Sequence, residues 1–123
     1  MSTRPRLTQT LYGACYYNEY HPIERLDQDF KDMEDANLTV LRVGESVWST
    51  WEPRDGEFNL DWLQPVLDKA YKQGISVIIG MPTYAMPNWL RIKHPEFMAD
   101  RKTGFPIPFG HRQNMDYSNP LFV

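Results

Sequence analysis

The stretch Leu38-Thr39-Val40-Leu41-Arg42-Val43-Gly44-Glu45-Ser46-Val47-Trp48 decides the fold. It begins as a β-branched apolar run, which is typical of a buried strand, and ends in a glycine followed directly by a glutamate. In an alternating strand, Leu41 and Val43 share one face, whereas Val40 and Arg42 share the other. A charge inside a buried strand is costly unless it is paired, so we expect Arg42 to face a carboxylate or a wet cavity. A salt bridge that only ties elements together is the alternative.

Two more strands are predicted, one on each side of this stretch in the chain. Residues 11–17 form the first strand and residues 75–80 form the third. The third is almost continuously apolar, which is typical of parallel strands covered on both faces. Because a helical pattern separates each pair of strands, the sequence predicts a βαβαβ arrangement with right-handed crossovers.

Both helices between the strands are predicted from apolar residues at three- and four-residue steps. The first follows Pro22, closes near Asn37 and carries Ile23, Leu26, Phe30, Met33 and Ala36 on its apolar face. Its charged residues, Asp29 among them, are assigned to the other faces. The second begins at a capping box and ends at Gly74 as the C′ residue. That capping box pairs Asp61 with Gln64, and the helix is expected to bury Trp62, Leu63, Val66, Leu67, Ala70 and Tyr71.

The remaining segments are predicted to be loops at the carboxyl ends of the strands. Residues 48–58 form a long connection with a turn at Asp55-Gly56. About thirty residues follow the third strand, broken by prolines and holding one short helix over residues 88–94. A loop of that length is too long for simple linkage, so we expect it to be functional.

Composition and charge describe a small soluble protein. The 123 residues are 41% hydrophobic and 24% charged, and the net charge of −3 with no basic patch disfavours nucleic acid as a partner. No run approaches the length of a membrane span, and residues 1–10 lack a signal-peptide core. Cys15 is the only cysteine and sits in an apolar run, so we expect a buried, inert thiol and no disulfide within the chain. This pattern favours a cytoplasmic location and no membrane partner.

Two architectures contain βαβαβ units: the open doubly wound sheet and the closed (β/α)8 barrel. No Gly-x-Gly-x-x-Gly follows the first strand, which disfavours dinucleotide binding. In both architectures the site lies at the carboxyl ends of the strands. In this chain those ends carry Tyr16, Tyr17 and Glu19, then Gly44, Glu45 and Trp48, then Pro82, Thr83 and Tyr84.

An ordered series of motifs resembles the N-terminal part of glycoside hydrolase family 42. The series is Gly13-Ala14-Cys15-Tyr16-Tyr17-Asn18-Glu19, Arg42-Val43-Gly44-Glu45 with Trp48, Glu52-Pro53 and Gly56, Gly80-Met81-Pro82-Thr83 with Pro87 and Trp89-Leu90, His94-Pro95-Glu96, and Phe109-Gly110-His111-Arg112. Each motif alone is weak, but the ordered series covers roughly residues 11–120. The resemblance implies a retaining β-galactosidase built on a (β/α)8 barrel. The expected fold class is therefore α/β, as about three βα units of a TIM barrel, with residues 1–10 as an extended lead-in and residues 11–123 as an incomplete catalytic barrel that stops before the fourth strand.

The same resemblance places the catalytic pair outside this chain. In the family, the acid/base glutamate follows an asparagine at the end of the fourth strand, and the nucleophilic glutamate ends the seventh. Retaining hydrolysis needs two carboxyl groups about 5–5.5 Å apart. Glu19, Glu45 and Glu52 are the only glutamates near predicted strand ends, and the resemblance assigns the chemistry to none of them. We therefore expect both catalytic residues beyond Val123, an inactive 123-residue chain, and loop-ordering roles for Glu45 and Glu52.

Three residues carry over from the family as binding or supporting groups. Arg112 matches the arginine that hydrogen-bonds galactose in the subsite for the non-reducing sugar, a task suited to a rigid guanidinium fork. Its alternative is a solvated loop arginine. Arg42 matches the strand-two arginine that supports the nucleophile by a charged hydrogen bond. Glu45, in the same motif, is assigned with Arg42 to the supporting shell. With that partner absent from the chain, Arg42 is expected to be strained or solvated.

Departures from the family pattern leave substrate preference open. Asn18 stands where many relatives have proline, and Ser46 where many have phenylalanine. Some members bind zinc through a cysteine cluster that begins just after the site arginine. Here that position is Asp116 and Cys15 is the sole cysteine, so a thiolate zinc site is excluded and no metal or cofactor is expected. The expected partners are a β-galactoside substrate and, by resemblance, two further copies in a homotrimer.

Alternative functions remain open at this point. The chain can belong to another barrel glycosidase of the same broad clan, acting on a different β-linked sugar. It can also be a noncatalytic carbohydrate-binding or assembly module that keeps half a site. In each case, three strands of a barrel have two open edges and an uncovered inner face, which predicts marginal stability, aggregation or self-association.

Overall fold

The computed structural model describes residues 10–83, 85–98, 104, 110 and 115–120, and it divides into two compact units. The first unit takes in the chain up to residue 43 together with residues 66–78. The second takes in residues 44–65 and the chain from residue 79 onward. The expected lead-in at residues 1–10 lies almost wholly outside the described residues.

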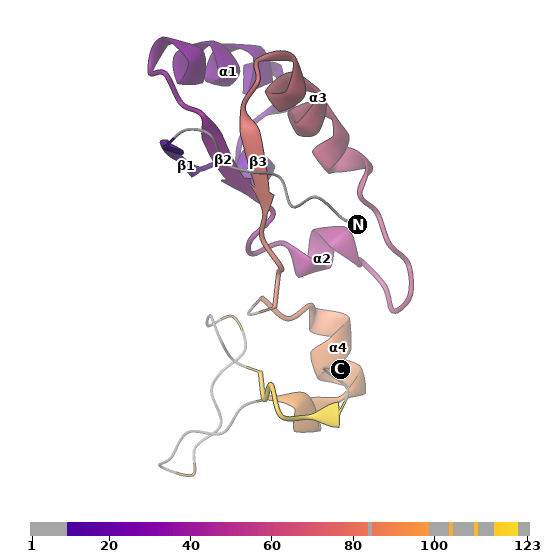
Figure 1. The fold of residues 1–123 in the computed structure, drawn as a ribbon. Helices are drawn as coiled ribbons and strands as arrows, with labels where there is room; N and C mark the ends of the chain where they lie inside the picture. The colour runs from indigo at the N-terminus through magenta and orange to yellow at the C-terminus, as the bar shows by residue number, and fades with distance from the viewer. Residues whose placement is uncertain (1–9, 84, 99–103, 105–109, 111–114, 121–123) are drawn as a thin grey trace, which may run out of the picture. The chain divides into compact units, whose positions relative to one another are not determined.

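A three-stranded sheet forms the centre of the first unit, with the strands in the order β1-β2-β3 (Figure 1). The strand bounds are Gly13–Cys15 for β1, Val40–Val43 for β2 and Ser76–Ile79 for β3. Strands β1 and β2 are parallel, with Gly13 opposite Val40 and Cys15 opposite Arg42. The arrows of β2 and β3 also point the same way in Figure 1. The predicted βαβαβ order of elements is therefore confirmed.

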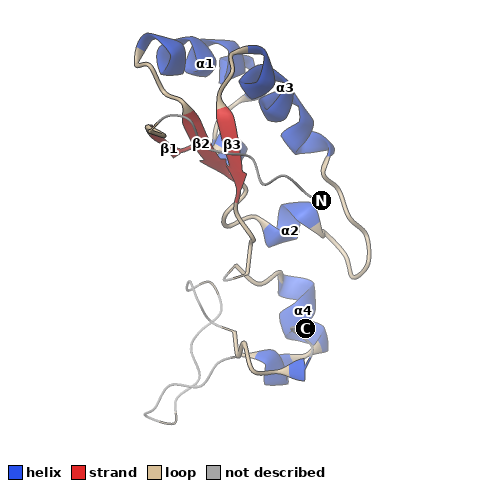
Figure 2. Cartoon of the chain, viewed as in Figure 1, coloured by secondary structure: helices blue, strands red, loops and turns tan. Residues whose placement is uncertain are grey.

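Helical segments fill the connections between and after the strands (Figure 2). A short 3-10 turn leads directly into each of the two longest helices. The bounds are Asn18–Tyr20 for η1, Ile23–Arg25 for η2, Leu26–Asp35 for α1, Trp48–Trp51 for α2, Asp61–Leu63 for η3, Gln64–Lys72 for α3, Asn88–Lys93 for α4 and Pro95–Phe97 for η4. Helix α2 lies in the connection that the sequence predicted to be a loop.

Both long helices end in the same hydrogen-bonded turn with a left-handed residue. Asn37, with φ of 55°, closes α1, and Gly74, with φ of 69°, closes α3. After α3, the Gly74 N–H donates to the Tyr71 carbonyl and the Ile75 N–H to the Ala70 carbonyl, at 3.2 and 2.9 Å. This is the Schellman arrangement, so the predicted C-terminal end of each helix is confirmed.

The core of the first unit lies between the sheet and the helices α1 and α3, which run along the same side of it (Figure 2). The alternation predicted for β2 is confirmed, because Leu41 and Val43 are buried while Arg42 is exposed. Phe30 from α1 and Val66 from α3 are fully buried. An ion pair between side chains of α1 and α3 also links the two helices. The apolar face of each helix thus covers the sheet face that Leu41 occupies.

The opposite face of the sheet corrects two expectations from the sequence. Cys15 is exposed rather than buried, because it pairs with Arg42 and shares its uncovered face. Strand β3 is also largely open, with Ile78 and Ile79 about half exposed at 49% and 47%, rather than covered on both faces. A continuous apolar strand needs a layer on each side, and within the described residues helices supply only one.

The second unit has a separate small core below the short helix α4. Its buried members are Met86, Leu90, Phe97 and Met115, against which Trp48, Trp89 and Met98 pack. An isolated antiparallel bridge joins Met98 to Met115, and the Asp116 N–H donates to the Phe97 carbonyl at 2.9 Å. The short helix expected near residues 88–94 is confirmed as α4, and it ends before Pro95 as predicted.

Three further residues differ from their predicted environment. Asp29 is buried on α1 rather than solvated, since it lies three residues after Leu26 and hence on the apolar stripe. Tyr71, expected inside, is 88% exposed on α3. Ile23, assigned to the apolar face of the first helix, is 59% exposed. Within the described part of the chain, no helix has the length and apolar character to cross a membrane.

Candidate functional site

Two glycines shape the turns that leave β2 and β3. Gly44 follows β2 with φ of 75°, and a Cβ placed on it would lie 2.8 Å from the Trp51 ring. Gly80 follows β3, and a Cβ there would lie 3.0 Å from the Cα of Glu45. A Cβ on Gly44 would force a shift of the Trp51 ring, and a Cβ on Gly80 would press on the Glu45 backbone. The lack of a side chain on Gly80 therefore lets the loops after β2 and β3 approach closely. Glu45, half-buried, therefore lies directly beside the end of β3.

The predicted site residues fall in different places. Arg42 is exposed on the open sheet face, next to Cys15 in register, as expected for a side chain with no covering layer. Glu45 lies in the turn after β2 and belongs to the second unit. Arg112 lies outside the described residues. The structure therefore positions two of the three and gives the direction of Arg42 relative to its strand.

Glu52 is a hydrogen-bonding centre for the loop that follows β2. Its side chain is buried, with only 8% of the residue exposed. Its Oε2 accepts from Trp48 Nε1 at 2.8 Å, and its Oε1 accepts from the Gly56 N–H at 2.9 Å. Its backbone carbonyl accepts from Trp89 Nε1, also at 2.8 Å. Glu52 thus ties α2, the turn at Gly56 and α4 together, which is a loop-ordering arrangement.

Glu19 is the third glutamate near a strand end, and it lies in η1 just after β1. It is half-buried. Burial raises the pKa of the Glu19 carboxyl, while its backbone N–H and the charge of nearby His21 act in the opposite direction. Burial raises the pKa of catalytic carboxyl groups and of structural ones alike, so this shift does not by itself make Glu19 a catalytic residue.

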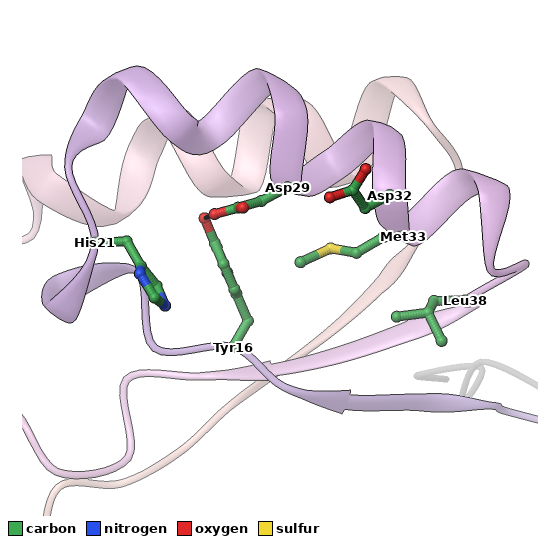
Figure 3. A pocket seen from close by; sticks show the side chains of 6 residues that line it. All are labelled: Tyr16, His21, Asp29, Asp32, Met33 and Leu38. Carbon is green, nitrogen blue, oxygen red and sulfur yellow. Dashed lines mark hydrogen bonds between the residues drawn. The ribbon is translucent and has the colours of Figure 1, made fainter.

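A hollow of about 320 Å³ lies on the helix side of the first unit (Figure 3). Tyr16 rises from the end of β1 toward Asp29 on α1, with His21 and Met33 among the other lining residues. The Tyr16 hydroxyl donates to Asp29 Oδ2 at 3.0 Å, and Arg25 Nη2 reaches Asp29 Oδ1 at 3.0 Å. Burial, followed by the hydrogen bond to Asp29, raises the pKa of Tyr16 well above its usual value.

Sequence reasoning missed this Tyr16–Asp29 pair, although a signal for it exists. Asp29 stands on the apolar stripe of α1, four residues after Arg25. An acidic residue on a buried stripe needs partners, and an arginine one turn earlier is the usual one. Tyr16 is adjacent to Cys15 and points to the opposite face of the sheet from Arg42. The pair therefore anchors β1 to α1 on the side away from the predicted sugar site.

Asp116, which stands at the position that the family resemblance linked to zinc binding, forms local hydrogen bonds in this chain. Asp116 Oδ1 accepts from the Ser118 N–H at 2.9 Å and from the Ser118 hydroxyl at 2.5 Å. These two hydrogen bonds lower the pKa of Asp116. Across the part of the chain that the structure describes, no cluster of three or more His, Cys, Asp or Glu side chains is arranged to hold a metal ion. Asp116 thus closes a turn.

Parallel strands in sequential order, helices on one face and loops gathered at the strand ends define the N-terminal portion of a (β/α)8 barrel protein. Comparison with known sequences then gives the family. The profile of glycoside hydrolase family 42, described as β-galactosidase, matches residues 15–123. The chain therefore belongs to glycoside hydrolase family 42, as its motifs predicted.

Individual relatives agree with this assignment. The β-galactosidase of Thermus thermophilus is 33% identical over 112 residues, which are 91% of this chain and 17% of the relative. The β-galactosidase YesZ of Bacillus subtilis is 32% identical over 111 residues, again 17% of the relative. The chain thus spans about 17% of the length of the curated relatives it matches.

Solved structures agree with the sequence matches. The crystal structure of β-galactosidase from the psychrophilic Marinomonas ef1 superposes with a TM-score of 0.85 at 36% identity, covering 92% of this chain and 17% of that one. The cold-adapted β-galactosidase from Rahnella sp. R3 gives a TM-score of 0.84 at 34% identity, with 91% and 17% covered. The match is to the N-terminal part of those chains.

Proposed function

We propose that this chain supplies the N-terminal part of a retaining β-galactosidase that removes terminal non-reducing β-D-galactose residues. The supporting observation is the family match over residues 15–123, to relatives that are themselves β-galactosidases. Residues 11–123 form an incomplete catalytic barrel in this proposal, and the acid/base and nucleophilic glutamates lie beyond Val123. The chain alone is then inactive, because retaining hydrolysis needs both carboxyl groups about 5–5.5 Å apart.

The residues of this chain contribute binding and support. Arg112 binds the non-reducing galactose, and Arg42 supports the nucleophile by a charged hydrogen bond. The exposure of Arg42 on the open sheet face favours this role, because a closed barrel turns that face inward, toward the charges at its centre. Glu45 belongs to the same supporting shell, held beside Gly80 at the end of β3. No cofactor takes part, and the proposed setting is a cytoplasmic homotrimer.

Hydrolysis of 4-nitrophenyl β-D-galactoside tests this proposal. The assay compares the 123-residue chain with the chain extended to its natural stop codon. Activity only in the extended protein supports the missing-carboxylate proposal. Activity in the short chain, abolished by Glu45→Gln, would show that the catalytic pair was assigned wrongly. A panel of nitrophenyl glycosides separates a β-galactosidase from another retaining β-glycosidase, and no activity on any of them in the extended protein favours a noncatalytic carbohydrate-binding or assembly module.

Two variants of the extended protein examine the arginines separately. Arg112→Ala is expected to raise KM with little change in kcat, because the galactose hydrogen bond that it removes is made in both the ground state and the transition state. Arg54→Ala is the matched control, since Arg54 is 79% exposed at its side chain and pairs with Glu57 on the loop surface. Equal loss of activity in both variants would contradict the assignment of Arg112.

A further inference from the structure

A hollow of about 400 Å³ lies within the second unit, between the loops that follow β2 and β3. We call it the aromatic hollow, because indole, phenyl and other apolar groups make up most of its lining. Those lining residues are Trp48, Trp51, Phe58, Met81, Pro82 and Thr83, together with Glu52. Phe58 and Met81 are 73% and 70% exposed, so its entrance is open and apolar. None of the residues carried over as substrate-binding or supporting groups, Arg42, Glu45 and Arg112, is among these lining residues.

Most polar groups of the aromatic hollow are already engaged. Trp48 Nε1 donates to Glu52 Oε2, and the other Glu52 oxygen accepts from the Gly56 N–H. The Trp51 Nε1 atom is buried without a hydrogen-bond partner, and the protein atoms around it cover it from a ligand in the hollow. Among the lining side chains, the Thr83 hydroxyl is then the principal polar group that a ligand can reach. A hydroxyl-rich sugar placed here would leave several hydrogen bonds unmade, which is costly.

We propose that the aromatic hollow binds an apolar aromatic leaving group of a β-galactoside. This inference rests on the proposed function, because it assigns the leaving-group side of the same substrate. Substrates of barrel enzymes lie over the carboxyl ends of the strands, where the loops after β2 and β3 form this hollow. A dry cavity of about 150 Å³ already accepts benzene, so a hollow of about 400 Å³ has room for a ring and its substituents. The buried Glu52 carboxylate disfavours an anionic ring.

The test is ligand-observed saturation-transfer NMR on the 123-residue chain with three glycosides. These are phenyl β-D-galactoside, phenyl β-D-glucoside and methyl β-D-galactoside. We expect saturation on the phenyl protons of both phenyl glycosides, with dissociation constants within about threefold of each other, and at least about tenfold weaker binding of the methyl glycoside. If the galactose assignment fails, the nitrophenyl panel reports it and the phenyl signal here is unaffected. Methyl β-D-galactoside binding as tightly as the phenyl compound would overturn the inference.

Variants locate the binding to the aromatic hollow. Phe58→Ala and Met81→Ser each remove an exposed lining side chain, so the fold is retained, and each is expected to weaken phenyl binding by about threefold to tenfold. Tyr71→Ala is the matched control, because Tyr71 is an equally exposed aromatic residue on α3 that does not line the hollow. Equal loss in Tyr71→Ala would refute the assignment. So would a Phe58→Ala chain that binds phenyl glycosides normally but loses self-association, since the hollow would then be a contact between copies.

Discussion

The most direct test of the loop after β2 is removal of the Glu52 side chain. Glu52→Ala deletes the acceptors of the Trp48 indole N–H and the Gly56 backbone N–H, in a position where the residue is 8% exposed. Each buried donor left without a partner costs about 1–3 kcal/mol. With two such donors, we expect the local free energy of opening of this loop to fall by about 2–6 kcal/mol. Glu52→Gln keeps one acceptor oxygen, so its expected cost is about 1–3 kcal/mol.

Hydrogen exchange of the tryptophan indole N–H groups, followed by NMR, measures this loss where it occurs. If the new amide nitrogen in Glu52→Gln faces the Trp48 indole, the indole N–H loses its hydrogen-bond acceptor. We then expect its protection from hydrogen exchange to fall about tenfold to a hundredfold. The Trp89 indole donates to the Glu52 backbone carbonyl, which the substitution keeps. Its protection is therefore expected to persist, and it acts as an internal reference in the same spectrum.

A control variant and two possible outcomes test whether the Glu52 hydrogen bonds stabilise this loop. Glu57→Gln changes an exposed glutamate of the same loop that pairs with Arg54, so its expected effect is below about 0.5 kcal/mol. Unchanged Trp48 protection in Glu52→Ala would refute the role given to Glu52. Equal loss at Trp48 and Trp89 in Glu52→Gln would show that the loop unfolds as a whole, and that the hydrogen bonds do not act separately.

Four further predictions concern the first unit. Tyr16→Phe leaves Asp29 with Arg25 as its partner and is expected to cost about 1 kcal/mol in denaturant unfolding; no change would contradict the buried hydrogen bond. The pKa of Tyr16 is higher in the folded state than in the unfolded state, so its contribution to folding stability is complete below about pH 10 and is lost as the pH rises above that value. One tyrosine absorbance step at 295 nm should therefore accompany alkaline unfolding and should be missing in Tyr16→Phe. Cys15 is exposed, so a thiol reagent modifies it in the native chain at a rate near that of the denatured chain. Gly13→Ala would push a Cβ into the Val40 carbonyl oxygen, so we expect loss of β1 pairing by hydrogen exchange, whereas a fully protected β2 would argue against the register. Analytical ultracentrifugation is expected to show self-association, and a monodisperse monomer with a cooperative melt would contradict it.

Local signals in the sequence were sufficient for the order of elements. Asn37 and Gly74 tolerate positive φ, and both end helices where the apolar periodicity stops. The alternation in β2 correctly predicted that Leu41 and Val43 share a buried face and that Arg42 lies on the other face. These features depend on residues close together in the chain, which is why single-sequence reasoning recovers them.

The misassigned residues are those whose environment is set by distant parts of the chain. Asp29 was assigned to a polar face because its charge outweighed its position, yet Tyr16, thirteen residues away, completes its hydrogen bonds. Glu52 orders its loop as expected, but its hydrogen bond with Trp89 spans 37 residues and could not be predicted from local sequence. For the candidate site, Arg42 and Glu45 could be assigned from the sequence to a strand and to the turn after it, whereas their mutual geometry could not.

Burial was misjudged for Cys15 and β3 for a different reason, which bears on function. Apolar side chains such as Ile78 and Ile79 are appropriate to a strand covered on both faces, and here they are about half exposed. One of these two neighbouring strand residues shares the open face with Arg42, a charge that a closed barrel would direct toward its centre. Since the chain spans about 17% of the relatives it matches, the sequence of this face is suited to contacts that its own described residues do not make. The exposed apolar strand residues and the exposed arginine therefore have one physical explanation: both fit the interior of a barrel of which this sheet forms the first three strands.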